Sequence, residues 1–168
     1  MSTLETNLIQ PSTGTTLTVG ASGDTITVPS GATLTASGHV LQVVQVVYST
    51  QTTQTTSYAD TGLTASITPA STSNKVLVLV NQQVYWSTNG LSIKIVRDTT
   101  DVYTPSVNYT YHGGGTNPRF YYPINYLDSP SSTSSVAYKT QCIGHSSGTF
   151  YTQEGNNLST ITLMEIAG

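Results

Sequence analysis

The chain has 168 residues, enough for one domain and an appendage, and only 8% of them are charged, whereas ordinary soluble domains carry about 25%. The net charge of -3 and the five Lys and Arg residues argue against a nucleic-acid-binding protein, because nothing here neutralises a row of phosphates. The abundant Val, Ile, Thr and Tyr residues favour strands and argue against intrinsic disorder.

The sequence predicts neither a membrane span nor a secretory signal. No apolar run reaches the roughly 18 residues of a membrane helix, and the first residues lack the basic and apolar regions of a signal peptide. The single cysteine, Cys142, leaves no internal disulfide. We expect it to be a small buried residue on a strand.

Residues 1–38 contain a short repeat in which four β-favouring residues lead to a Ser-Gly turn. The repeats are residues 16–19 before Ser22 and Gly23, residues 25–28 before Ser30 and Gly31, and residues 33–36 before Ser37 and Gly38. A unit of eight or nine residues cannot bury a face alone and must stack on neighbours. We therefore interpret residues 1–38 as an oligomerisation and attachment arm. The alternative is a flexible Ser/Thr/Gly linker.

The apolar residues of this arm are too few to form a core within one chain. They are Leu4, Leu8, Ile9, Leu17, Ile26 and Leu34. Three chains winding together would place Leu17, Ile26 and Leu34 inside and leave the threonines in water.

The strongest strand signal lies at residues 75–86, "KVLVLVNQQVYW". Val76, Val78 and Val80 share one face, and Leu77 and Leu79 share the other. A strand that is apolar on both faces is either central in the fold or covered by another chain. We expect it to pair with residues 91–96 through a tight hairpin at Asn89 and Gly90.

Further strands are predicted over residues 39–49, 120–126, 136–142, 149–153 and 159–166, separated by turn-rich clusters. No window has the periodicity of a long helix. Several short strands at regular spacing predict an antiparallel β-sandwich, jelly-roll-like, over residues 39–168. Asp98 and Asp101 could together hold a cation, but no further acid lies near them, so a hairpin turn in solvent is expected.

The segment from Tyr103 to Tyr126 is the main candidate contact surface, because tyrosine offers a large contact area and a polar tip at low entropic cost. The candidate residues are Tyr109, Tyr111, His112, Arg119, Tyr121 and Tyr122. They could contact another subunit or a cell-surface glycan. Alternatively, several of these aromatic residues are ordinary core and edge residues of the sandwich.

Two motifs suggest a serine hydrolase, but their context does not fit. Residues 112–115 read "HGGG", like an oxyanion-hole motif, and residues 144–148 read "GHSSG", like a nucleophile elbow. The elbow requires a following helix and a later histidine. The residues after Gly148 read as a strand, and no histidine follows Ser146. We expect both motifs to be loops, and we expect no enzyme activity, cofactor or metal.

The two ends and the middle of the chain resemble tail-fibre-like and capsid-decorating proteins of bacteriophages, especially aquatic ones. The resemblance rests on residues 1–38, on the C-terminal "STITLMEIAG", and on "YADTGLTASITPASTSNKVLVLV", in which a "TGL" turn precedes the apolar strand. It implies a virion protein, commonly trimeric, with an N-terminal arm attached to the particle and a β-sandwich facing outward.

Together these observations predict a homotrimeric structural protein on the outer surface of a phage virion, made in the host cytoplasm before assembly. Two roles remain open. A decoration (cement) protein would bind the major capsid protein or another virion component, whereas a short tail fibre or tailspike tip would bind a host-surface glycan. Neither role involves nucleic acid or a membrane.

Overall fold

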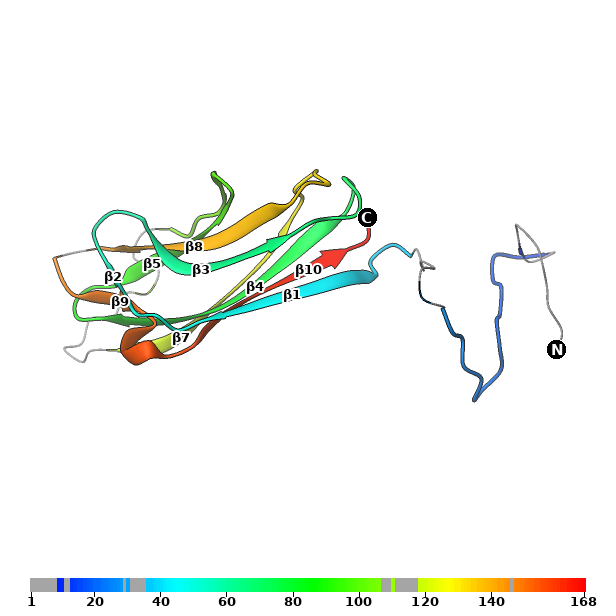
Figure 1. Cartoon of the computed structure of the whole chain (residues 1–168), viewed down its shortest axis with the longest axis horizontal. Helices are drawn as coiled ribbons and strands as arrows, with labels where there is room; N and C mark the ends of the chain where they lie inside the picture. Colours follow the sequence, from blue (N-terminus) through cyan, green and yellow to red (C-terminus); the bar gives the residue numbers. More distant parts are fainter. Residues whose placement is uncertain are drawn as a thin grey trace. The chain divides into compact units, whose positions relative to one another are not determined.

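The computed structural model describes residues 9–10, 13–28, 30, 36–106, 110, 118–145 and 147–168. The chain divides into two compact units, Met1–Leu34 and Thr35–Gly168. Figure 1 shows the second unit as two layers of strands, and its labels are used below.

In the first unit, residues 21–24 form a turn that closes itself. The Asp24 amide donates to the Ala21 carbonyl (3.1 Å), and the Asp24 carboxylate accepts from the Ala21 amide (2.7 Å). Gly23, third in the turn, has φ 94°, which a type II turn requires and glycine adopts without steric cost. The predicted Ser-Gly turn is therefore present in this repeat.

The same turn recurs at residues 36–39, at the start of the second unit. The His39 amide donates to the Ala36 carbonyl (3.1 Å), and Gly38 has φ 79°. Ala167 binds the last two residues of this turn, because the Gly38 amide donates to the Ala167 carbonyl and the Ala167 amide donates to the His39 carbonyl, each at 2.8 Å.

The β-favouring segments of the repeat, residues 16–19 and 25–28, are not strands in the described part of the chain. A strand is defined by pairing with a neighbour, and these segments have none among the described residues. The side chains of Ile9, Leu17 and Ile26 are exposed. Leu4, Leu8 and Leu34 lie outside the described residues.

The described part of the second unit contains ten strands and one short 3-10 helix. They are β1 (Val40–Tyr48), β2 (Thr52–Gln54), β3 (Ala59–Ile67), β4 (Lys75–Trp86), β5 (Leu91–Arg97), β6 (Thr100–Tyr103), β7 (Arg119–Asp128), β8 (Val136–Gly144), β9 (Phe150–Thr152), η1 (Glu154–Asn156) and β10 (Ser159–Ile166).

These strands form two sheets in which every pairing is antiparallel. In sheet A, β4 pairs with β10 and then β9 along one edge and with β7 along the other, while β1 extends the sheet beyond β10 and β2 extends it beyond β9. Sheet B has the order β3-β8-β5-β6. The predicted all-β antiparallel sandwich is confirmed.

The core lies between the two sheets and follows from the alternation of side chains along each strand. On β4, Val76, Val78 and Val80 are buried, as their shared face predicts. Tyr138 and Cys142 on β8 are fully buried opposite them in sheet B. The expectation that Cys142 is a buried strand residue is confirmed.

A cluster of polar side chains is also buried between the sheets. Thr140 lies at the centre, with its hydroxyl 2.5 Å from that of Thr61 and 2.8 Å from the Gln82 amide oxygen. The Gln82 amide nitrogen donates to Ser159 (3.1 Å). Because these groups pair with one another, the core avoids the cost of burying unsatisfied polar atoms.

The predicted hairpin between residues 75–86 and 91–96 is wrong. β4 belongs to sheet A and β5 to sheet B, so residues 87–90 carry the chain from one sheet to the other. Both edges of β4 are occupied along most of its length, which leaves no place for β5. Asn89 has φ 57°, and asparagine tolerates this left-handed turn position.

The "TGL" sequence is not a turn, as the resemblance implied, but a bulge within β3. The pairing of β3 with β8 shifts register between Asp60 and Thr64. Gly62 has φ 85°, and a Cβ atom there would collide with the ring of Tyr48 on β1. The glycine therefore allows β3 to pass close to β1.

Candidate functional site

The outer face of sheet A, which points away from the core, carries an apolar row across four strands. Val43 on β1 pairs with Met164 on β10, Met164 pairs with Leu77 on β4, and Leu77 pairs with Leu127 on β7. Residues paired in register project from the same side of a sheet. The four side chains therefore form one continuous apolar row.

More apolar residues flank this row on the same face. We call the set the apolar face; it comprises Val40, Val43, Val47, Leu77, Leu79, Leu127, Met164 and Ile166. The exposed fractions are 43% for Val40, 55% for Val43, 51% for Val47 and 49% for Leu127. Side chains exposed to this degree are not covered by any described part of the chain.

The remaining positions on this part of the sheet are almost all neutral. Gln45, Thr162 and Asn125 lie in register beside Leu79. The charged exception is Lys75, at the end of β4, where it pairs with Ile166. The face therefore presents apolar groups and neutral amides or hydroxyls, with one cation at its margin.

At the other end of β4, the outer face of sheet A becomes aromatic. The Tyr85 and Tyr151 rings stack with their centroids 5.5 Å apart. The Arg119 guanidinium lies 5.0 Å from the Tyr85 ring centroid and donates two 2.9 Å hydrogen bonds to the Glu154 carboxylate. These bonds raise the pKa of Arg119. We call Tyr85, Tyr151, Arg119 and Glu154 the aromatic end.

The predicted contact surface divides between the two sides of β7. Arg119 and Tyr121 project from the outer face, and Tyr121 is 52% exposed. Tyr122 points the other way and packs against the core, because neighbouring side chains in a strand alternate. The other candidates, Tyr109, Tyr111 and His112, lie outside the described residues.

The apolar face itself was predicted only through Leu77 and Leu79. Val43, Leu127 and Met164 lie in strands that the sequence predicted, but only the register of the sheet brings them beside Leu77. The alternation along each strand, taken together with the pairing order, is the signal that would have identified them.

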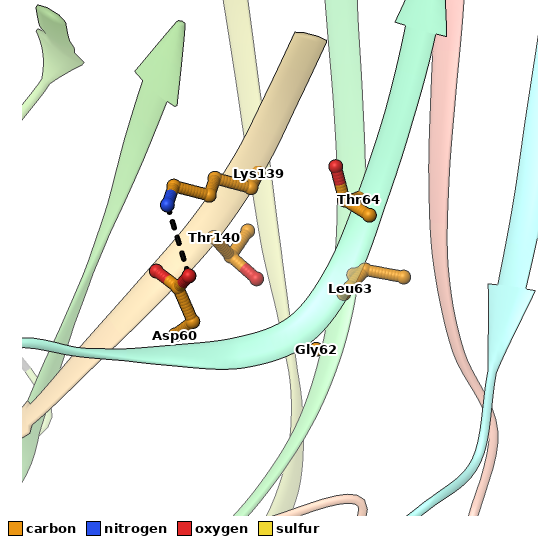
Figure 2. A pocket seen from close by; sticks show the side chains of 6 residues that line it. All are labelled: Asp60, Gly62, Leu63, Thr64, Lys139 and Thr140. Carbon is orange, nitrogen blue, oxygen red and sulfur yellow. Dashed lines mark hydrogen bonds and ion pairs between the residues drawn. The ribbon is translucent and has the colours of Figure 1, made fainter. Parts of the chain in front are cut away.

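A shallow pocket lies at the bulge of β3 in sheet B, lined by Asp60, Gly62, Leu63, Thr64, Lys139 and Thr140. Figure 2 shows Asp60 and Lys139 meeting across it. The Lys139 ammonium contacts the Asp60 carboxylate at 2.9 Å, and Gln141 donates to the same carboxylate at 2.7 Å. These hydrogen bonds lower the pKa of Asp60. The charged groups satisfy each other, so the bulge is explained by packing alone.

The elbow-like sequence has the wrong surroundings for a hydrolase. It follows β8 and leads into β9, a strand rather than a helix. The His145 Nε2 atom lies 2.7 Å from the hydroxyl of Ser92, which is almost fully buried. Burial lowers the pKa of His145. Ser146 and residues 113–115 lie outside the described part.

The two aspartates beside "TT" lie in the β5–β6 hairpin and point to different partners. Asp98 exchanges hydrogen bonds with Ala137 at the start of β8, and Asp101 forms a 2.8 Å ion pair with Lys94. The described residues contain no group of three or more His, Cys, Asp or Glu side chains placed to hold a metal. Within that same part of the chain, no helix has the length and apolar character to cross a membrane.

The comparisons with known proteins give structural neighbours only. No protein-family model matches the sequence, and no curated protein matches it. The structure is similar to an infectious bursal disease virus VP2 subviral particle, with 15% identity over 86% of this chain and a TM-score of 0.39. It is also similar to the T13 viral particle of that virus, with 14% identity over 86% of this chain and a TM-score of 0.37.

Both structural neighbours come from particles of a virus. This chain spans about two fifths of their length, 42% of the first chain and 40% of the second.

Proposed function

We propose that this chain is a structural protein of a bacteriophage virion, most directly a trimeric capsid decoration protein that stabilises the shell and exposes its β-sandwich. The observation that carries the proposal is the apolar face. Val43, Val47 and Leu127 are each about half exposed, on a part of sheet A where Lys75 is the one charged side chain among the described residues.

A surface of this kind fits a protein that works by contact. Large exposed apolar patches usually mark interaction sites on soluble proteins. Full burial of a Val or Leu side chain stabilises by roughly 1.5–3 kcal/mol, and a half-exposed side chain has about half of that still to gain on association. Several such residues on one face favour a lasting assembly.

The resemblance to tail-fibre-like and capsid-decorating phage proteins supports the proposal that the chain is part of a phage particle, because the similar segments include both ends of the chain. The arm supports attachment close to the particle surface. Its Leu17 and Ile26 side chains are exposed within one chain, so a neighbouring arm or the shell could bury them. Three arms acting together would gain affinity through effective concentration.

The test is the copy number of the protein in purified virions, measured by mass spectrometry against isotope-labelled standards. Hundreds of copies per particle are expected for a decoration protein. A few dozen copies or fewer would favour a tail fibre. Absence from purified virions would contradict the proposal.

A short tail fibre or tailspike tip that recognises a host-surface glycan is the second candidate. The aromatic end favours it, because Tyr121 is exposed close to the Arg119–Glu154 pair, and aromatic rings beside hydrogen-bonding groups suit sugars. A glycan array would show binding that is lost in Tyr121→Ala. An array without signal would remove the basis for this candidate.

A further inference from the structure

We propose that the outer face of sheet A, consisting of the apolar face and the aromatic end, is the surface through which copies of this chain associate. In the trimer, three such faces would enclose a second core around the symmetry axis. This inference rests on the proposed function. It adds which surface forms the contact and that the contacting molecule is a second copy of the chain.

The size of the face fits a stable interface. β4 has 12 residues, which span about 40 Å at roughly 3.3 Å per residue, and four strands spaced about 4.8 Å apart are about 19 Å wide. The face therefore measures about 750 Å². A standard interface takes about 800 Å² from each partner. Neither the apolar face nor the aromatic end reaches this size alone.

The charge distribution favours a second copy as the occupant. Lys94, Arg97, Arg119 and Lys139 each form an ion pair, and Lys75 has no ion-pair partner among the described residues. A charged partner would have to bury its charges against apolar side chains without compensation, which is costly. Another copy brings the same apolar face, with Lys75 at its margin, and an aromatic end in which Arg119 and Glu154 neutralise each other.

The β7 edge of sheet A argues for contact through the face. β7 is an edge strand in the described part of the chain, where it pairs with β4 alone. Pro123 lies within it, and proline has no N–H to donate to an added strand. Addition of another strand at this edge is therefore disfavoured. The pleated apolar rows can instead pack against another sheet at about 10 Å, as in a sandwich core.

The test compares the full chain with the double variant Val43→Lys/Leu127→Lys by light scattering. Both side chains point into solvent in the single chain, so the variant should fold. We expect the parent to have the mass of three chains of 17.8 kDa and the variant to have the mass of one. The buried charges should raise the concentration at which the assembly dissociates by at least about 100-fold. The control Ser66→Lys, exposed on sheet B, should keep the parent's mass.

A measurement on the unaltered protein covers the case in which the variant fails to fold. Met164, half-buried on the apolar face of the single chain, should be protected from peroxide at high protein concentration and oxidised after dilution. Three results would overturn the inference. They are equal oxidation of Met164 at both concentrations, a parent protein that has the mass of a single chain, and a folded double variant that keeps the parent's mass. Absence of the protein from virions would contradict the proposed function, but it would not affect the conclusion about how copies of the chain associate.

Discussion

The Tyr138 hydroxyl on β8 donates a 2.7 Å hydrogen bond to the Asp128 carboxylate on β7, and this bond joins sheet B to sheet A. Arg97 on β5 contacts the same carboxylate oxygen at 2.6 Å. Tyr138 is fully buried. Burial first, and then the neighbouring carboxylate, raises the pKa of the Tyr138 phenol. The phenol therefore stays protonated and acts as a donor across the sandwich.

Replacing Tyr138 with phenylalanine should lower the free energy of unfolding by about 1.5–3 kcal/mol, the range for a hydrogen bond to a charged group. Urea unfolding at fixed protein concentration measures the change. The control is Tyr126→Phe, because the Tyr126 hydroxyl has no hydrogen-bond partner among the residues that the structure describes; this change should alter stability by less than about 0.5 kcal/mol. Equal losses of stability in the two variants would contradict the role of the Tyr138 hydroxyl in joining the two sheets.

The raised pKa of Tyr138 also predicts how stability depends on alkaline pH. A raised folded-state pKa contributes stability that is fully present below the ordinary tyrosine pKa of 10.0 and is lost as pH rises toward the folded-state value. The parent should therefore lose stability above that pH more steeply than Tyr138→Phe. Melting curves from neutral to alkaline pH would show it, and parallel curves would refute it.

Cys142 should be inert toward thiol reagents in the folded protein. Its side chain is fully buried, and burial raises the pKa of the thiol, so little thiolate forms. We expect labelling by a disulfide reagent to be at least about 1,000-fold slower in native buffer than in denaturant, because it requires opening of the core. Rapid labelling in native buffer would show that β8 opens locally.

Glu165 predicts a loss of stability in acid. Its carboxylate is almost fully buried and accepts hydrogen bonds from Gln42 and Asn74 (both 2.5 Å) and from the Ala70 amide (2.7 Å). Burial alone would raise the pKa of Glu165, but these bonds outweigh burial and lower it below 4.5. The stabilisation is present above that value and is lost as pH falls through the folded-state pKa.

The measurement is the melting temperature between about pH 3 and pH 7. The parent should lose stability at the acid end, whereas Glu165→Gln should start lower and vary less over this range. A variant with the same pH profile as the parent would show that other carboxylates control the acid transition.

Gly62→Ala should destabilise the protein by about 3 kcal/mol. The added methyl group would collide with the Tyr48 ring, and alanine would also hold a positive φ. Gly155→Ala is the matched control. Gly155 has φ 65° as well, but its new Cβ would meet only the Asn157 amide at an ordinary 3.6 Å, so about 1–2 kcal/mol is expected. Thermal unfolding of the two variants measures the difference, and equal losses of stability would contradict the collision with Tyr48.

Deleting residues 1–34 should leave a folded sandwich that no longer joins the particle. The remaining unit, Thr35–Gly168, keeps both sheets. Co-sedimentation with undecorated capsids would test attachment, with the full chain at low and high salt as the control. Because residues 1–34 contain only two charged side chains, Glu5 and Asp24, salt should weaken binding of the full chain only slightly. Normal co-sedimentation of the truncated protein would place the anchor in the sandwich.

The antiparallel sandwich could be predicted because β4 is apolar from Val76 to Val80 and because β8 alternates along its length. The partner of β4 could not. An Asn-Gly dipeptide favours a hairpin locally, but pairing is decided by β10, β9 and β7, which are distant in sequence and occupy both edges of β4. The local sequence therefore determines the turn at Asn89, whereas tertiary packing determines which sheet β5 joins.

The buried polar cluster shows a second limit. Thr61, Thr140 and Gln82 are fully buried, although a hydrophobicity pattern assigns such residues to the surface. Only their mutual hydrogen bonds make their burial tolerable, and those bonds connect three strands. For the candidate site, Leu77 and Leu79 indicated a covered face, but Val43 and Leu127 became its neighbours only through register.

The neutrality of the apolar face has a thermal consequence. Burial of apolar surface weakens on cooling, because its driving force near room temperature is entropic. Copies held together through Val43, Leu77, Leu127 and Met164, with Lys75 the only charge beside them, would respond to temperature more than to ionic strength. Such an assembly would loosen on ice and tighten on warming, and sulfate or sucrose would strengthen it.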